Sequence, residues 1–339
     1  MRVRFFGTRG SIAAPLGAGD VAEKVRRALV SGLGRSLRTP EDVDRFMRTH
    51  LSFSTTGTFG GQTSCVQICS DERSLVLDMG TGLRTLGSEL MARNPQRAPM
   101  HVDILLSHPH WDHIAGFPFF APLTSPSTTV TIHACHDTIE AALRRQHGDP
   151  SFPVPFDQIA ADVSFARLEP GRTTEIGGFA VTPMRQHHEG DSFAYRIDDG
   201  TRTLVYATDT EFLDGTPGEA EEAAAFFADA DMVVFDAMYT LAEAATDRRR
   251  FGHASNVQGA DICMRAGARR LCLFHHDPRR RDDELQRLLD QTRRYVALQG
   301  ADDTLEVIAA HDGLDYVLTD GVVTPPRACT EPAAGFARC

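Results

Sequence analysis

Short apolar segments recur along the chain, and a polar side chain follows each of them. The segments are Leu75–Leu77, Ile104–Leu106, Leu204–Thr208, Met232–Phe235 and Leu271–Phe274. Continuous apolar runs of this length are typical of strands that are buried on both faces. We expect the polar residues that follow them to share one rim of a sheet, where sheet proteins commonly form their ligand sites.

Stretches with helical periodicity lie between these runs. Leucines spaced i, i+3 and i+7 from Leu83 to Leu90 indicate one helix, and Val257–Ala266 indicates another. Asp282–Leu298 is amphipathic and ends just before a glycine. The alternation of strands and helices predicts a layered fold of the mixed α/β (α+β) class.

Residues 15–58 stand apart from this alternation. Asp20–Ser31 has a helical pattern, and a second helix is expected to begin at Pro40 with Thr39 as its N-cap. We expect a single domain over residues 1–322, with a helical insertion at about 15–58 that serves as a lid or a dimer contact. The tail 323–339, rich in proline, alanine and arginine, is expected to be disordered.

Charge and composition exclude several classes of protein. The 339 residues carry 35 Lys and Arg against 46 Asp and Glu, a net charge of −11, which argues against stable nucleic-acid binding. The chain has neither a membrane-length apolar run nor a signal-peptide core at its start. Its seven cysteines form no C-x-x-C pair, as expected of a reducing compartment. We therefore expect a cytoplasmic protein without membrane contact, and consider a homodimer.

Candidate metal ligands are concentrated in the segment His-Pro-His-Trp-Asp-His at residues 108–113, directly after an apolar run. Imidazole and carboxylate groups suit zinc and similar divalent ions. A strand or a helix cannot point all of these histidines one way, so we expect a tight loop around metal ions. His108 and His110 could hold one ion while Asp112 and His113 reach a second.

Four later segments contain histidine or aspartate, and two of these segments lie at the ends of predicted strands. They are Gln186–Gly190, Tyr206–Thr210, Phe251–Ser255 and Phe274–Pro278. Each histidine taken alone is more often structural than a ligand. Together with the loop at 108–113, they predict a site for two metal ions.

Three further segments carry a resemblance to a known family. They are Phe6–Ser11, Gly60–Cys65 and Leu77–Gly82. With the His-x-His-x-Asp-His loop, they resemble the metallo-β-lactamase superfamily, on its phosphodiesterase and ribonuclease Z side, over roughly residues 1–322. The resemblance implies an αββα sandwich with the metal ions at one edge.

The resemblance also implies a role for each candidate residue. The implied ligands are His108, His110 and His188 for the first ion, Asp112, His113 and His275 for the second, and Asp209 between them. His253 matches a Gly-His motif that assists the leaving group in relatives, and Asp112 is expected to orient the nucleophile as well. Asp78 is expected to accept a hydrogen bond from a ligand histidine without binding the metal itself, which would fix the tautomer and orientation of that imidazole.

Two of these positions have an adjacent histidine as an alternative. His187 could replace His188, although the register before Tyr195-Arg196 favours His188. His276 could replace His275, although the position at the strand end favours His275. Glu189 and Asp191 stand where relatives usually have proline and glycine, and they add carboxylates near the site.

The implied chemistry is hydrolysis of a phosphodiester. Two divalent ions, Zn²⁺ by default with Mn²⁺ or Fe²⁺ as alternatives, can share a hydroxide that forms near neutral pH. The Gly252-His253 motif favours phosphodiesters, and the acidic chain without a basic arm favours a small substrate such as a cyclic nucleotide. The alternatives are a lactone or thioester hydrolase and a ribonuclease Z-like endonuclease. A non-catalytic metal-binding protein is disfavoured because every ligand position is filled.

Overall fold

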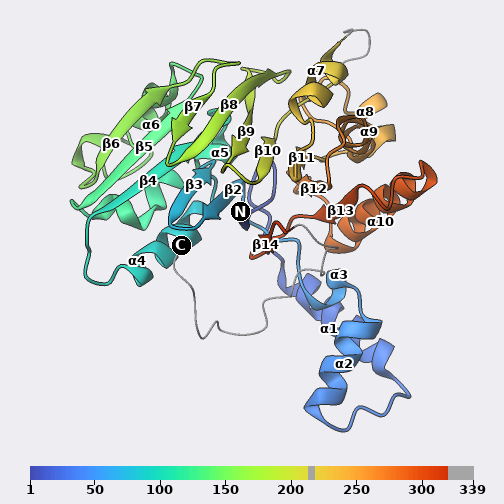
Figure 1. Ribbon diagram of the computed structural model, residues 1–339. Coiled ribbons are helices and arrows are strands. Elements are labelled where there is room, and N and C mark those ends of the chain that lie inside the picture. The colour runs from blue at the N-terminus through green and yellow to red at the C-terminus, as the bar shows by residue number, and fades with distance from the viewer. Residues whose placement is uncertain (213–217, 320–339) are drawn as a thin grey trace.

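The computed structural model describes residues 1–212 and 218–319 and shows two β-sheets packed face to face (Figure 1). The first sheet has the order β14-β1-β2-β3-β4-β5-β6, and the second has the order β13-β12-β11-β10-β9-β8-β7. The first sheet contains β1 (Arg2–Gly7), β2 (Cys65–Ser70), β3 (Arg73–Leu77), β4 (Met100–Leu105), β5 (Thr128–Ala134), β6 (Asp162–Arg167) and β14 (Asp315–Val317). The second contains β7 (Thr174–Ile176), β8 (Phe179–Gln186), β9 (Ser192–Asp198), β10 (Thr203–Ala207), β11 (Met232–Asp236), β12 (Arg270–Phe274) and β13 (Glu306–Ala309).

Helices cover the outer face of each sheet. The first sheet is covered by α4 (Leu83–Arg93), α5 (Trp111–Ile114), η1 (Phe117–Phe119), η2 (Ala121–Thr124), α6 (Ile139–Gln146) and η3 (Phe156–Gln158). The second is covered by α7 (Glu219–Phe226), α9 (Asn256–Ala266) and α10 (Asp282–Leu298), with α8 (Leu241–Ala245) packed on α9. The resulting αββα sandwich confirms the fold class predicted from the sequence.

Apolar side chains from both sheets form the central core. Val66 and Leu77 of the first sheet pack with Tyr195, Tyr206 and Phe274 of the second, and all five are completely buried. Separate clusters fill the space between each sheet and its helices. Strands that contribute to an inner and an outer cluster must be apolar on both faces, which explains the continuous apolar runs of β4, β10, β11 and β12.

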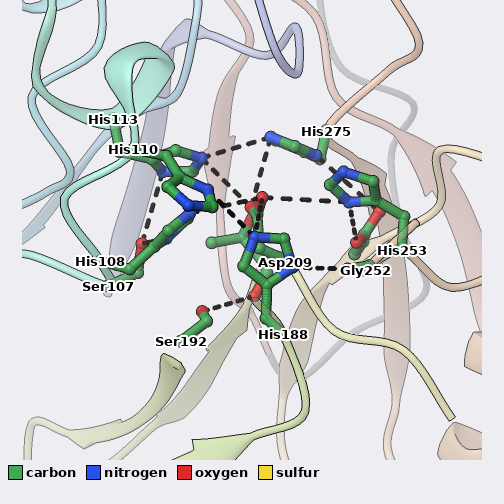
Figure 2. A network of polar contacts seen from close by, with 12 residues as sticks. Ser107, His108, His110, His113, His188, Ser192, Asp209, Gly252, His253 and His275 are labelled. Carbon is green, nitrogen blue, oxygen red and sulfur yellow. Dashed lines mark hydrogen bonds and ion pairs between the residues drawn. The ribbon is translucent and has the colours of Figure 1, made fainter. Parts of the chain in front are cut away.

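The strand directions bring the polar rim together. Strands β3 to β6 are mutually parallel, and so are β10 to β13. The carboxyl ends of parallel strands meet at the same edge of a sheet, so the residues after β3 and β4 are neighbours, as are those after β10, β11 and β12. The two edges face each other, and the candidate metal centre lies between them (Figure 2).

The segment between β1 and β2 is helical. It contains α1 (Ala18–Gly32), α2 (Pro40–His50) and α3 (Phe53–Thr56), and α1 and α2 project away from the sandwich beside α10 (Figure 1). The Thr39 hydroxyl accepts a hydrogen bond from the backbone N–H of Asp42 at 3.2 Å, and Pro40 is the first helical residue. No helix in the described ranges has the length and apolar character that crossing a bilayer requires. The tail that the sequence predicts to be disordered, residues 323–339, lies outside the described residues.

Candidate metal centre

The His-Pro-His-Trp-Asp-His segment forms a loop and one short helical turn after β4. His110 is the N-cap of α5, and the backbone N–H of His113 donates to the carbonyl of His110 at 3.0 Å. This turn lets Asp112 and His113 point one way while His108 and His110 lie on the other side. His108 and His113 are completely buried, whereas His110 is exposed.

Three residues at the site have left-handed backbone conformations one or two positions after the ends of their strands. Asp78, Asp209 and His275 have φ angles of 59°, 51° and 57°. This conformation is uncommon outside glycine and, where it persists, concentrates at functional sites. It ends each strand abruptly at the rim, so these three side chains stay beside the sheet edge.

Four side chains surround the position implied for the second ion. The His113 Nε2 lies 3.2 Å from an Asp112 oxygen and 3.2 Å from Asp209 Oδ1. The His275 Nε2 lies 3.1 Å from Asp112 Oδ2 and 3.3 Å from Asp209 Oδ1. All four residues are buried. Two imidazoles and two carboxylates are a donor set that suits a first-row divalent ion.

Three imidazoles surround the position implied for the first ion. The ligand atoms of His108, His110 and His188 lie within 4.8 Å of one another. His188 Nε2 is 3.2 Å from His110 Nδ1. Such closeness of nitrogen atoms that carry lone pairs is typical of a ligand cage rather than of a hydrogen-bonded core.

Asp209 lies between the two groups and faces both (Figure 2). Its Oδ1 faces His113 and His275, at 3.2 and 3.3 Å. Its Oδ2 faces His108 and His188, at 3.7 Å from each Nε2. One carboxylate with its two oxygens turned to two sets of donors is the arrangement that a bridging ligand needs.

The buried charges in this cluster require compensation. Burial opposes the charged form of His113, but Asp112, Asp209 and Asp78 together raise its pKa well above the ordinary value. Burial and the neighbouring charge of His113 lower the pKa of His108 well below its ordinary value. The buried His108 Nε2 has no hydrogen-bond partner among the described residues. An unpaired acceptor nitrogen beside a carboxylate fits a cation, so the residues present fit the metal ions that the resemblance implies.

Outer partners fix the orientation of the imidazole rings. His113 Nδ1 donates to Asp78 Oδ2 at 2.7 Å, which leaves the Nε2 lone pair for the centre. Asp78 also accepts from the Ser107 backbone N–H at 2.8 Å and from the Tyr206 hydroxyl at 2.7 Å. His188 Nδ1 donates to the Gly252 carbonyl at 2.7 Å.

His253 lies beside the two groups and is backed by Asp236. Its Nδ1 donates to Asp236 Oδ2 at 2.9 Å and is 3.9 Å from Asp209 Oδ2. Burial opposes the charged form of His253, but Asp236, followed by Asp209 and Asp112, raises its pKa to about 9. The sequence placed Asp236 at a strand end but assigned it no role. The repeated pattern of an apolar run ending in aspartate was the signal that it belongs with the others.

Comparison with known proteins identifies the family of this chain. The beta-lactamase superfamily domain matches residues 73–276, which is more than half of the chain. The chain belongs to this superfamily. The match begins at β3 and ends just after His275, so it includes all the residues gathered around Asp209.

Two curated proteins are similar to this chain. Ribonuclease Z of Halobacterium salinarum (strain ATCC 29341 / DSM 671 / R1) is 27% identical over 265 residues, which cover 63% of this chain and 80% of the relative. The probable metallo-hydrolase YhfI of Bacillus subtilis (strain 168) is 25% identical over 232 residues, covering 65% and 84%. With these relatives and this fold, the chain is a metallo-β-lactamase-fold hydrolase.

Two solved structures have a similar fold over nearly the whole chain. The crystal structure of YhfI matches with a TM-score of 0.60 and 20% identity, covering 93% of this chain and 98% of that one. A diphosphatase from the PhnP family matches with a TM-score of 0.56 and 17% identity, covering 94% and 98%. At these identities the likeness concerns the fold.

The two adjacent histidines lie away from the cluster. His276 is buried, and its Nε2 donates to the Ala310 carbonyl at 2.8 Å, while burial lowers its pKa to about 3. His187 is exposed. Of the two unusual carboxylates, Glu189 is exposed and Asp191 forms an ion pair with Arg185 at 2.6 Å. The structure therefore brings His188 and His275, rather than their neighbours, to the centre.

Proposed function

We propose that the protein is a dinuclear metal-dependent phosphodiesterase that hydrolyses a small phosphodiester, such as a cyclic nucleotide. His108, His110 and His188 would hold one divalent ion, Asp112, His113 and His275 would hold the second, and Asp209 would lie between them. Zn²⁺ is the first choice for a site this rich in imidazole, with Mn²⁺ or Fe²⁺ as alternatives.

The position of Asp209 carries this proposal. Its two oxygens face separate donor groups, at 3.2–3.3 Å on one side and 3.7 Å on the other. A pair of bound divalent ions would supply an ionised water near neutral pH and would stabilise the charge that develops on phosphate oxygens. Asp112, which also accepts the Ser11 backbone N–H at 2.7 Å, is held where it can orient the attacking water.

His253 supports a substrate with an alkoxide leaving group, such as a phosphodiester, over a thioester, whose thiolate departs without a proton. An alkoxide leaving group needs a proton, and an imidazolium held by Asp236 is suited to donate one. The raised pKa of about 9 keeps His253 protonated at neutral pH. Bound cations would lower this value by neutralising Asp209 and Asp112, bringing it closer to the working pH.

A cavity beside His188 offers room for the organic part of a small substrate. Its volume is about 500 Å³, within the range of small-molecule sites. Phe212 supplies apolar surface, and the exposed Glu222 supplies a carboxylate that can accept hydrogen bonds, whereas the Glu211 carboxylate already accepts the backbone N–H groups of Arg250 and Gly252. Such a lining suits a planar group that carries N–H donors, and it disfavours a second phosphate.

A ribonuclease Z-like activity on RNA is the second candidate, because a relative with that name is 27% identical. The net charge of −11 argues against it, since RNA binding depends on neutralising many phosphates.

The deciding experiment combines metal analysis with a substrate panel. Protein purified without added ions would be assayed for bound metal, then tested on cyclic nucleotides, bis-p-nitrophenyl phosphate, an acyl-homoserine lactone and a precursor tRNA. We expect about two ions per chain and turnover of the phosphodiesters. Turnover of the lactone alone, or of the tRNA alone, would refute the proposal.

A further inference from the structure

The cavity beside His188 contains a buried hydrogen-bond acceptor that has no donor. Gln186 lines the cavity at the end of β8 and is 6% exposed. Its Nε2 donates to the Thr208 carbonyl at 2.9 Å, which fixes the amide with Oε1 as the free end, because a flipped amide would bring two oxygens together. This Oε1 accepts no hydrogen bond from any described residue. An unsatisfied buried acceptor is costly, so its position indicates a ligand that donates to it.

A carboxylate of α7 adds a second free acceptor to the same cavity. Glu219, the first residue of α7, lines the cavity, and its Oε2 is buried without a donor among the described residues. The exposed Glu222 lies one turn further along the helix. Arg185 is the only lysine or arginine among the described lining residues, and it already donates to Asp191 at 2.6 and 3.0 Å. The cavity therefore has acceptors in excess, and it suits a ligand rich in N–H donors.

Aromatic surface in the cavity favours a flat ligand. Phe212 lines the cavity and lies nearly parallel to Phe235, with the ring centroids 6.3 Å apart and 14° between the ring planes. This packing fixes the Phe212 ring, and a fixed ring offers a stacking surface for a base. The volume of about 500 Å³ has room for a bicyclic base and its sugar.

The cavity adjoins the proposed metal centre. His188 lines the cavity, and its Nε2 lies 3.7 Å from Asp209 Oδ2 within the cluster. Thr210, the residue after Asp209, lines the cavity as well. A nucleotide whose phosphate lies at the metal centre can therefore place its base in this cavity.

We propose that the cavity selects a guanine base, so that, given the proposed function on which this inference rests, the substrate is a small guanine nucleotide. Guanine carries its N1–H and its N2 amino group side by side on one edge. An edge made only of donors matches acceptors such as Gln186 Oε1 and the Glu219 carboxylate. Adenine has a ring acceptor beside its amino group, and that nitrogen would face an oxygen with no hydrogen between them. Hypoxanthine keeps the N1–H but lacks the amino group, so it should bind with intermediate affinity.

Ligand-detected NMR titration with nucleosides tests base selection separately from catalysis. Guanosine has no phosphate, so its binding to the Zn²⁺-loaded full chain does not require phosphodiesterase activity. We expect guanosine to bind at least about 10-fold more tightly than inosine and about 100-fold more tightly than adenosine. Each lost hydrogen bond to a charged group corresponds to roughly a 10- to 150-fold loss of affinity.

Two substitutions alter the free acceptors. Glu219→Gln replaces the carboxylate by an amide, and Gln186→Leu removes the amide oxygen. Either change should lower the ratio of kcat/KM for cyclic GMP to that for cyclic AMP at least about 10-fold. Glu221→Gln is the matched control and should keep the wild-type ratio, because Glu221 is an exposed glutamate of the same helix that does not line the cavity. Gln186→Leu also removes the hydrogen bond to Thr208, so Glu219→Gln decides the test if thermal melting shows Gln186→Leu unfolded.

The outcomes separate this inference from the proposed function. Failure to turn over any phosphodiester would refute the proposed function, even where guanosine binds. Guanosine that binds no more tightly than adenosine, or a preference for cyclic GMP that survives the substitutions, would overturn guanine selection, even where phosphodiesters are cleaved. Preferential turnover of glycerophosphoethanolamine, whose ammonium group also donates N–H bonds, would overturn it in favour of a cationic head group.

Discussion

Replacing Asp236 with asparagine tests how the proposed proton donor is supported. The carboxylate accepts the His253 Nδ1–H at 2.9 Å and is completely buried. A hydrogen bond between charged groups contributes about 1.5–3 kcal/mol. If this energy acts in the transition state, Asp236→Asn should lower kcat/KM roughly 10- to 150-fold for substrates with an alkoxide leaving group.

The loss should depend on the leaving group. A nitrophenolate departs without a proton, so kcat/KM for bis-p-nitrophenyl phosphate should fall by less than about threefold. Asp236 also accepts the backbone N–H of Thr210 and of Met238, at 3.2 and 3.1 Å, so folding should be checked by thermal melting. Asp247→Asn is the matched control, because Asp247 is exposed in the same connection between β11 and α9. It should leave kcat/KM unchanged for both substrate types.

A double-mutant cycle decides whether Asp236 acts through His253. In a His253→Ala background, Asp236→Asn should lower kcat/KM little further, because the imidazole that Asp236 positions is already absent. Equal losses with and without His253 would refute the reasoning. So would equal losses on the two substrate types, since proton delivery could not then be the step affected.

Three other substitutions make further predictions. Asp209→Ala should remove bound metal and activity together, as measured by elemental analysis and turnover; retention of both ions would exclude a bridging role. Gly252→Ala should weaken metal binding, because the added Cβ would lie 2.5 Å from His188 Nδ1, whereas Gly200→Ala, at a similar positive φ but with nothing within 4 Å, should not. Asp312→Asn should alter the pH dependence of stability: burial raises the pKa of Asp312 to about 6. Since the unfolded carboxyl titrates near 4, the contribution of Asp312 to the wild-type unfolding free energy should fall by up to about 3 kcal/mol as pH rises from 4 through 6. Denaturation midpoints in the asparagine variant should lack that fall.

The sequence predicted the inner strands of the fold better than the outer ones. The runs ending at Asp78, Asp209 and Asp236 became β3, β10 and β11, because strands covered on both faces are apolar throughout. β8 was missed, since it alternates buried and exposed positions and contains Pro183, which cannot donate to a ladder.

The candidate site was predictable as a set of residues but not as a geometry. Histidine and aspartate at strand ends are visible in the sequence, and their convergence follows from parallel pairing. The choice of His275 over His276 depends on a left-handed turn at position 275, which directs the second ring to the Ala310 carbonyl. The pairing of Asp236 with His253 depends on the path of the intervening loop, which no local pattern encodes.

The charge of the centre links metal binding to substrate choice. Four buried carboxylates, Asp78, Asp112, Asp209 and Asp236, lie around one small volume in an already acidic chain. An anionic phosphodiester would be repelled by them. Two divalent ions would carry equal and opposite charge and would remove this repulsion. The ions would therefore be needed for an anionic substrate to bind, in addition to their part in its cleavage.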